Sequence, residues 1–389
     1  MGEKEKPTDA KESKTYPDWA PREGGAGFSS HVMKGVEGGH EGNSREAGGS
    51  VSRKKPARRR QPTVAELEAG IRAGNRTMLS RAITLVESNA REHQGKAQEL
   101  LDSLMEETGK SLRIGITGVP GSGKSTLIDS FGAMLCEAGH RVAVLAVDPS
   151  SSVTKGSILG DKTRMEKLAL QEAAFVRPSP TGGCLGGVAR KTRETILLCE
   201  AFGFDVILLE TVGVGQSEVT VRSMVDFFLL VMISGAGDEL QGIKKGVIEL
   251  ADSIVVNKAD GDNVQRARMA KAEYNRVLSF LHPCTEGWKT KAYMVSALTR
   301  EGIPKLWETV QRFRETTEES GVFERRRHEQ NLDWMHDLLN EALRQQFLAN
   351  REIHKTLKEL SGAVGRGEMP PVKAVETLME AWTGGDRPG

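Results

Sequence analysis

The segment from Gly118 to Ser125 reads GVPGSGKS and matches the phosphate-binding pattern GxxxxGK[ST]. Its glycines let backbone N–H groups curl around an anion, and a helix that follows would add unpaired donors and a positive dipole end. Residues 113–117 predict a buried strand before it and residues 126–137 predict a helix after it, which disfavours a chance glycine-rich turn. The sequence therefore predicts a nucleotide site made of Gly118, Val119, Pro120, Gly121, Ser122, Gly123, Lys124, Ser125 and Thr126.

Within this pattern, Lys124 is expected to reach the β- and γ-phosphates and to act in catalysis, and the Ser125 hydroxyl is expected to bind Mg²⁺. A second segment, ETVG, starts at Glu210, where the apolar run Val206–Leu209 ends. P-loop proteins use an acidic residue near the P-loop to hold the Mg²⁺ shell. We therefore predict Glu210 as a metal-binding and catalytic residue, with a plain surface carboxylate as the alternative.

The tetrapeptide NKAD, which begins at Asn257, follows the apolar run Ser253–Val256 and has the NKxD form that selects guanine. The carboxylate of Asp260 can accept hydrogen bonds from guanine N1 and the 2-amino group, which adenine does not offer, and an unpaired buried carboxylate discriminates strongly. Lys258 can lie across the base, and Asn257 can tie this loop to the P-loop. A backbone N–H of the segment Ser296, Ala297 and Leu298 is expected to complete the pocket. The predicted ligand is GTP or GDP.

Three further loops contain more charged residues than a simple connection between a strand and a helix requires. Asp148 follows the run Val142–Val147, and Asp161 and Arg164 come after an irregular stretch. The two carboxylates are candidates for the metal or the attacking water, and Arg164 can offset phosphate charge. A polar loop with a helix cap is the alternative. The third loop, residues 234–245, has glycines and both signs of charge, which predicts a mobile lid or a partner-sensing switch, with the roles of its single residues left open.

Composition narrows the class of protein. The 54 Lys and Arg residues balance 53 Asp and Glu residues over 389 positions, so no global field favours nucleic acid or an anionic membrane. The longest apolar run, Phe227–Ile233, is far short of the roughly 20 residues of a membrane span. Four cysteines form no CxxC pair, and neither Cys184 nor His282 with Cys284 has nearby partners for a metal. With no secretory or transit signal evident, we expect a soluble cytoplasmic protein that uses neither membrane nor nucleic acid.

The chain divides into four segments by pattern. Residues 1–60 predict a disordered tail, whose basic block Arg53–Arg60 is interpreted as a solvated linker rather than a nucleic-acid contact because no aromatic residues are interleaved. Residues 61–110 predict helices that open with the capping box Thr63 to Glu66, are divided by Gly70 and Gly74, and continue over residues 96–107.

Residues 111–318 alternate apolar runs with helical patterns. The further predicted strands are Val142–Val147, Ala174–Val176, Val206–Leu209, Phe227–Met232, Ser253–Val256 and Ala292–Val295. Such runs predict a mainly parallel sheet covered by helices on both faces, an α/β fold of the P-loop NTPase kind. Residues 319–389 predict a helical arm with an apolar stripe made of Leu332, Met335, Leu339, Ala342, Leu343 and Phe347. Packing of this stripe on the arm's own domain and pairing with a second copy both stay open.

Taken together, the motifs GVPGSGKST, AVDPSS, GDKTRM, LGGVARKTRET, ETVGVGQSE, GAGDELQGIKKG and NKAD closely resemble the G3E GTPases of the MeaB/ArgK/methylmalonic aciduria type A group. These are GTPase chaperones of adenosylcobalamin-dependent acyl-CoA mutases. The resemblance runs from about Thr63 into the C-terminal helices and leaves out the first 60 residues. It implies a P-loop fold of the signal-recognition/MinD (SIMIBI) class and a C-terminal helical arm that forms a homodimer.

The resemblance also assigns roles to particular residues. The positions that match the Mg²⁺ site are Ser125, Asp148, Asp161 and Glu210. Asp161 and Arg164 match the first switch, and the Glu210–Gln216 stretch matches the second. A third switch that responds to the mutase would contain Asp238, Gln241 and Lys244.

The expected function is slow, Mg²⁺-dependent hydrolysis of GTP to GDP and phosphate, which gates cobalamin loading and protects or reactivates a mutase such as methylmalonyl-CoA mutase. Lys124, Asp161, Arg164, Glu210 and Lys244 are the expected catalytic residues. Three alternatives remain: a metallochaperone GTPase, a transport-associated kinase of the type suggested by the name ArgK, and a nucleic-acid-binding GTPase. The scattered His and Cys residues count against the first.

Overall fold

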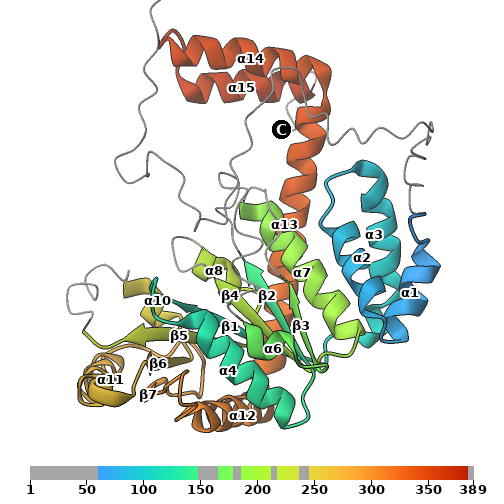
Figure 1. Cartoon of the computed structure of the whole chain (residues 1–389). Coiled ribbons are helices and arrows are strands. Elements are labelled where there is room, and N and C mark those ends of the chain that lie inside the picture. Colours follow the sequence, from blue (N-terminus) through green and yellow to red (C-terminus); the bar gives the residue numbers. More distant parts are fainter. Residues whose placement is uncertain (1–59, 148–164, 178–184, 212–216, 236–244, 384–389) are drawn as a thin grey trace, which may run out of the picture. The chain divides into compact units, whose positions relative to one another are not determined.

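The computed structural model describes residues 60–147, 165–177, 185–211, 217–235 and 245–383, and the chain from Gln61 onward forms one compact unit. Its centre is an all-parallel sheet with strand order β3-β2-β4-β1-β5-β6-β7 (Figure 1). The strands are β1 (Leu112–Gly118), β2 (Val142–Val147), β3 (Ala174–Arg177), β4 (Val206–Thr211), β5 (Phe227–Ile233), β6 (Ser253–Asn257) and β7 (Lys291–Met294). The predicted parallel α/β sheet is confirmed.

The strand ends differ from the predicted ones by at most two residues, and one difference matters. β4 continues through Glu210 to Thr211, although the apolar run stops at Leu209. Glu210 is aligned with Ile116 of β1 on one side and with Ala146 of β2 on the other. Pairing on both edges extends the strand past the last apolar side chain, so Glu210 lies within the sheet and not on the loop after it.

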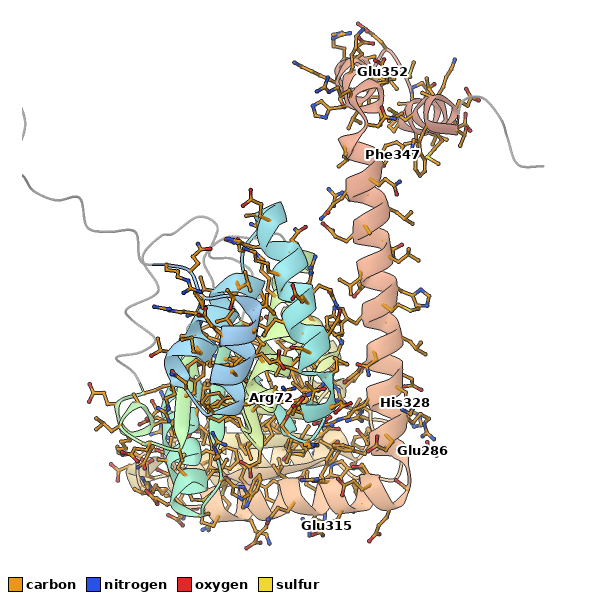
Figure 2. The ribbon with its side chains drawn as sticks, turned by 90° about the vertical axis from the view of Figure 1, so that its right-hand side faces the viewer. Arg72, Glu286, Glu315, His328, Phe347 and Glu352 are labelled. Atoms are coloured by element: carbon orange, nitrogen blue, oxygen red, sulfur yellow. The ribbon has the colours of Figure 1, made fainter. Side chains whose placement is uncertain are left out.

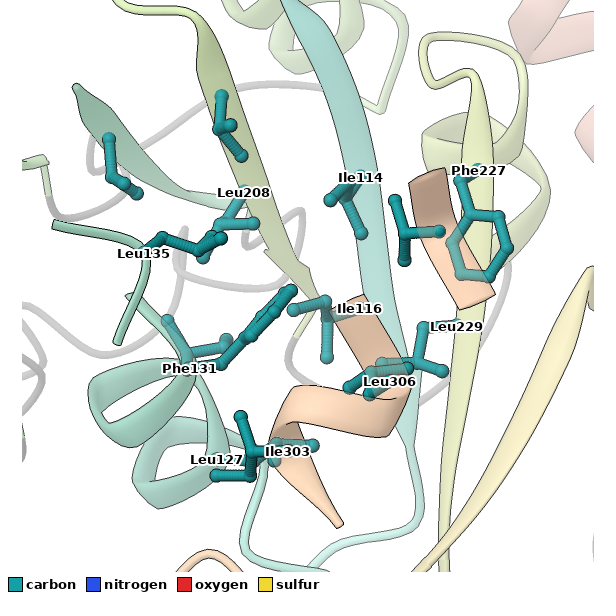
Figure 3. Packing of buried hydrophobic residues seen from close by; sticks show 14 of the residues in the cluster. Ile114, Ile116, Leu127, Phe131, Leu135, Leu208, Phe227, Leu229, Ile303 and Leu306 are labelled. Atoms are coloured by element: carbon teal, nitrogen blue, oxygen red, sulfur yellow. The ribbon is translucent and has the colours of Figure 1, made fainter. Parts of the chain in front are cut away.

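Helices cover both faces of the sheet. Those that follow the strands are α4 (Lys124–Glu137), α6 (Glu166–Ala169), α7 (Leu185–Ala201), α8 (Ser217–Arg222), α10 (Lys245–Glu249), α11 (Val264–Leu278) and α12 (Ile303–Glu319). On one face, Phe131 of α4 and Leu306 of α12 pack with Ile116 and Leu229 (Figure 3). On the other face, α7, α8 and the helices that precede β1 cover the opposite set of strand residues, such as Ile207 of β4. Because helices cover both faces of the sheet, side chains on either side of each strand are buried, which explains why the strands are apolar throughout.

The N-terminal helices are α1 (Val64–Arg72), α2 (Arg76–Val86) and α3 (Arg91–Ser103), followed by a 3₁₀ turn at Met105–Glu107. The capping box at Thr63 and Glu66 is present. The expected break lies at Gly74, but Gly70 is inside α1, because a glycine costs only about 1 kcal/mol within a helix that is otherwise well capped and buried. α3 starts five residues before the predicted helix, since its N-cap, Ala90, offers no side-chain signal.

The C-terminal arm consists of α13 (Val322–Ala349), α14 (Arg351–Gly365) and α15 (Pro371–Thr383). Val322 and Phe323 at the start of α13 are buried, whereas the later part of the helix is largely exposed. α14 contacts α13 and α15 near Phe347 at the end of α13 (Figure 2). The rings of Phe347 and Trp382 meet edge to face at 5.1 Å. The predicted helical arm is therefore present, and its role in dimerisation stays a prediction.

Candidate functional site

The P-loop connects β1 to α4 at the carboxyl edge of the sheet, where two close approaches exclude any side chain. A Cβ on Gly118 would lie 2.1 Å from Val231 O of the neighbouring strand β5. Gly123, with φ of 81°, is the N-cap of α4, and a Cβ there would lie 2.8 Å from Asn257 Nδ2. The glycines thus let the loop lie directly against the ends of two other strands.

Lys124 begins α4 and is folded back into the loop. Its ammonium group donates to Gly118 O at 2.9 Å and to Val119 O at 3.2 Å. Burial lowers the pKa of Lys124, while the nearby charges of Glu210 and Glu218 act in the opposite direction. The side chain therefore holds a partly desolvated positive charge at the place where the motif predicts phosphate groups.

Ser125 and Glu210 meet although 85 positions separate them in the chain. Ser125 Oγ at the start of α4 donates to Glu210 Oε1 of β4 at 2.7 Å, and Thr211 Oγ1 of β4 donates to Thr117 Oγ1 of β1 at 2.7 Å. Hydroxyl and carboxylate oxygens are the hard donors that Mg²⁺ takes, usually together with waters and substrate phosphates. These two residues fit a Mg²⁺ site beside the P-loop.

The NKAD segment lies at the end of β6, next to the P-loop. Asn257 Nδ2 donates to Ser122 O at 2.8 Å, and Asn257 Oδ1 accepts from Ala297 N at 3.2 Å. One buried amide thus joins the phosphate loop to the segment after β7. The backbone of Lys258 has a positive φ of 58°, which is strained for a residue other than glycine. Such strain is often found at ligand sites.

The Asp260 carboxylate accepts a hydrogen bond from Ser296 Oγ at 2.5 Å. The N–H of Ser296 donates to Glu301 O and that of Ala297 to Asn257 Oδ1. Among the described residues, the N–H of Leu298 has no such partner, and this residue is 74% exposed. Of the three residues predicted to face guanine O6, Leu298 is thus the one whose N–H is available, while Ser296 orients Asp260.

Several predicted site residues lie outside the described part of the chain. They are Asp148, Asp161, Arg164, Asp238, Gln241 and Lys244. One residue that the motifs did not single out is Glu218 on α8, which is buried and whose charge acts on Lys124. The only signal for Glu218 in the sequence is its place at the end of the ETVGVGQSE motif. A single glutamate in a short helix does not by itself indicate a functional role.

The parallel sheet carries a P-loop after its central strand, and the adjacent strand places a carboxylate beside the P-loop serine. An NKxD loop follows the strand two positions away. Together these features define a P-loop GTPase. The family model described as "Methylmalonyl Co-A mutase-associated GTPase MeaB" matches residues 79–352. The chain belongs to this family. Both the family and the fold class predicted from the sequence are thereby confirmed, as is the prediction that the protein is a GTP hydrolase.

Individual relatives agree with this placement. A "Putative GTPase" of Caulobacter vibrioides is 52% identical over 319 residues, which cover 82% of this chain and 98% of that protein. The mouse (Mus musculus) protein "Methylmalonic aciduria type A homolog, mitochondrial" is 44% identical over 332 residues, 83% of this chain and 80% of that protein. A solved structure described as "LAO/AO transport system kinase" superposes with a TM-score of 0.66 at 37% identity, covering 82% of this chain and 97% of that one.

Two kinds of feature are absent from the described residues. No helix there has the length and apolar character needed to cross a membrane. No group of three or more His, Cys, Asp or Glu side chains in the same residues is arranged to hold a metal ion.

Proposed function

We propose that this GTPase acts as a chaperone of an adenosylcobalamin-dependent acyl-CoA mutase such as methylmalonyl-CoA mutase. Hydrolysis of GTP to GDP and phosphate would gate loading of the cobalamin cofactor and protect or reactivate the mutase. Support comes from the family description, which names association with methylmalonyl-CoA mutase, and from the mouse relative named for methylmalonic aciduria.

The observation that carries the GTPase mechanism is the meeting of Lys124, Ser125, Glu210 and Asn257 at one edge of the sheet. In the proposed mechanism Lys124 neutralises phosphate charge and Asp260 selects guanine. Ser125 and Glu210, with Asp148 and Asp161, would hold Mg²⁺, which when bound offsets charge on the β- and γ-phosphate oxygens.

The remaining proposed roles follow from the family resemblance. Asp161 and Arg164 would form the first switch and the Glu210–Gln216 stretch the second. Asp238, Gln241 and Lys244 would sense the mutase. Basal turnover is expected to be slow, because P-loop GTPases whose transition-state clamp is incomplete gain about 10³–10⁵-fold when the missing cation is supplied. Binding of the mutase would re-aim Arg164 or Lys244 toward the phosphates.

The test is to add purified methylmalonyl-CoA mutase to the full-length protein and to measure phosphate release and cobalamin loading together. We expect the mutase to raise the GTPase rate and GTP to change the rate or extent of loading. A Lys124→Ala variant serves as control and should show neither effect. Mutase that changes neither quantity would contradict the proposed coupling.

A homodimer is proposed from the exposed stripe on α13. Leu332, Met335, Leu339 and Leu343 are each at least 45% exposed. They recur every three or four residues and so lie on one side of the helix. Four large apolar side chains in one stripe are best accounted for by a second copy of the arm.

A second candidate function is that of a transport-associated kinase, favoured by the similarity to the solved structure described as a transport system kinase. The two functions differ in the fate of the γ-phosphate. With GTP radiolabelled at the γ-phosphate, label that appears on protein would support the kinase, and label that appears only as free phosphate would support the GTPase chaperone. We place either activity in the cytoplasm, in keeping with cysteines that form no CxxC pair.

A further inference from the structure

Glu218 is a buried acid for which packing gives no reason. It lies in the first turn of α8, two residues after the proposed second switch, and is only 7% exposed. Its Oε2 atom has no hydrogen-bond partner within the described residues. An unpaired buried carboxylate oxygen destabilises the folded protein, so such an atom in a native structure calls for an explanation.

The placement of α8 puts Glu218 on the side of the helix that faces the sheet. α8 packs on β1 and β4, and Val221 Cγ1 lies 3.0 Å from the point that a Cβ on Gly115 would occupy. Glu218 precedes Val221 by three residues, so it shares this sheet-facing side and lies one turn closer to the helix start. The helix begins at the carboxyl edge, where β4 ends, and β1 runs from Gly115 toward Gly118 at that same edge (Figure 1).

The charge of Glu218 acts on the P-loop lysine. Within the part of the chain that the structure describes, Glu210 and Glu218 are the carboxylates whose charges act on Lys124. Glu210 has a partner there, because it accepts from Ser125. Glu218 has an unpaired oxygen in the same buried neighbourhood, so it adds negative charge where the phosphates of a nucleotide are expected to bind.

We propose that Glu218 is a positioning residue that competes with nucleotide phosphates for the positive charge of Lys124, weakening the binding of GTP more than that of GDP. This rests on the proposed role of Lys124 as the phosphate ligand. GTP carries one more negative charge than GDP at neutral pH, so a fixed carboxylate nearby repels it more strongly. A carboxylate at the start of α8 therefore biases the site against retaining GTP.

The test compares affinities of the full-length protein for fluorescent GDP and for a fluorescent, non-hydrolysable GTP analogue. Glu218→Gln removes the charge, and Glu218→Met removes it with a side chain that needs no hydrogen bond. For both variants we expect about 3- to 10-fold tighter binding of the GTP analogue, with a smaller gain for GDP. Val219→Ala is the matched control on the same helix, because Val219 is 61% exposed. It should leave both affinities unchanged.

Two further variants make the outcome decisive. Glu218→Asp keeps the charge and should keep the wild-type ratio of GTP to GDP affinity, whereas Lys124→Ala should abolish tight binding of both nucleotides. An unchanged ratio in Glu218→Gln and Glu218→Met, or weaker GTP binding, would overturn the role of Glu218 while leaving the site assignment intact. Tight binding by Lys124→Ala would instead overturn the assignment of Lys124, and the inference with it.

Discussion

At the scale of single residues, the candidate site depends on polar atoms that serve two loops at once. The amide of Asn257 donates to Ser122 O on the P-loop and accepts from Ala297 N after β7. The hydroxyl of Ser296 similarly donates to Asp260 and accepts from Thr299 N. Because each group is shared, the phosphate-binding and base-binding parts of the proposed site are held in one fixed relation.

Base selectivity can be tested at Asp260. An Asp260→Asn variant replaces a pure acceptor with an amide that also donates, so it can no longer accept two hydrogen bonds from N1 and the 2-amino group of guanine. We expect GTP binding to weaken by about 100-fold or more. XTP carries a carbonyl in place of the 2-amino group and should bind the variant better than GTP does. Competition of XTP and GTP against a fluorescent nucleotide measures this, and unaltered GTP affinity would contradict the role of Asp260.

At the scale of elements, the start of α13 is fixed to the amino end of the sheet by buried charge. Arg327 donates to both oxygens of Asp226, at 2.8 Å and 2.7 Å, and to Ser111 O at 2.6 Å. Asp226 is 1% exposed and also accepts from Arg113 N at 2.8 Å. Hydrogen bonds of Arg327 and Asp226 thus join the start of β1, the turn before β5 and the arm.

Removal of this clamp should be costly. An Arg327→Ala variant leaves the buried Asp226 charge without its main partner and should lower the free energy of unfolding by about 3–5 kcal/mol. Arg325→Ala is the matched control two residues away. Arg325 pairs with Glu286, and both side chains are more than half exposed, so its loss should cost less than about 1 kcal/mol. Urea denaturation followed by circular dichroism measures both, and equal small effects would show that the clamp does not stabilise the fold.

The same elements mark the limit of prediction from sequence. The strands were predictable because buried runs such as Val142–Val147 are apolar without interruption, and Lys124 and Ser125 because one contiguous motif contains them. The run Arg325–Arg327 gave no comparable signal: all three residues suit a charged helix surface, yet Arg327 is a buried clamp and Arg325 is exposed. Which charge is buried depends on contacts between residues about 100 positions apart, and local periodicity does not contain that information.

At the scale of the whole molecule, α8 links the proposed second switch to the arm. Arg193 donates to Gln330 O on α13 at 3.0 Å and to Ser223 O just after α8 at 2.8 Å. Gln330 Nε2 donates to Val225 O at 2.9 Å. The segment just after α8 is thus joined to α13 directly and through Arg193 of α7, so the arm contacts the part of the chain that follows the proposed second switch.

The exposed stripe on α13 can be tested as the interface of the proposed dimer. A charge placed at the centre of the exposed stripe, as in Leu339→Glu, would be buried without a partner in a dimer but solvated in a monomer. We expect Leu339→Glu to shift the protein to a monomer in analytical ultracentrifugation. Gln345→Glu adds the same charge on the opposite side of α13, which lines a cavity with α7 and α8, and should leave the association state unchanged. If both variants sediment as wild type does, this stripe does not form the interface. Monomeric Leu339→Glu that still binds GTP would show that the nucleotide site is complete within one chain.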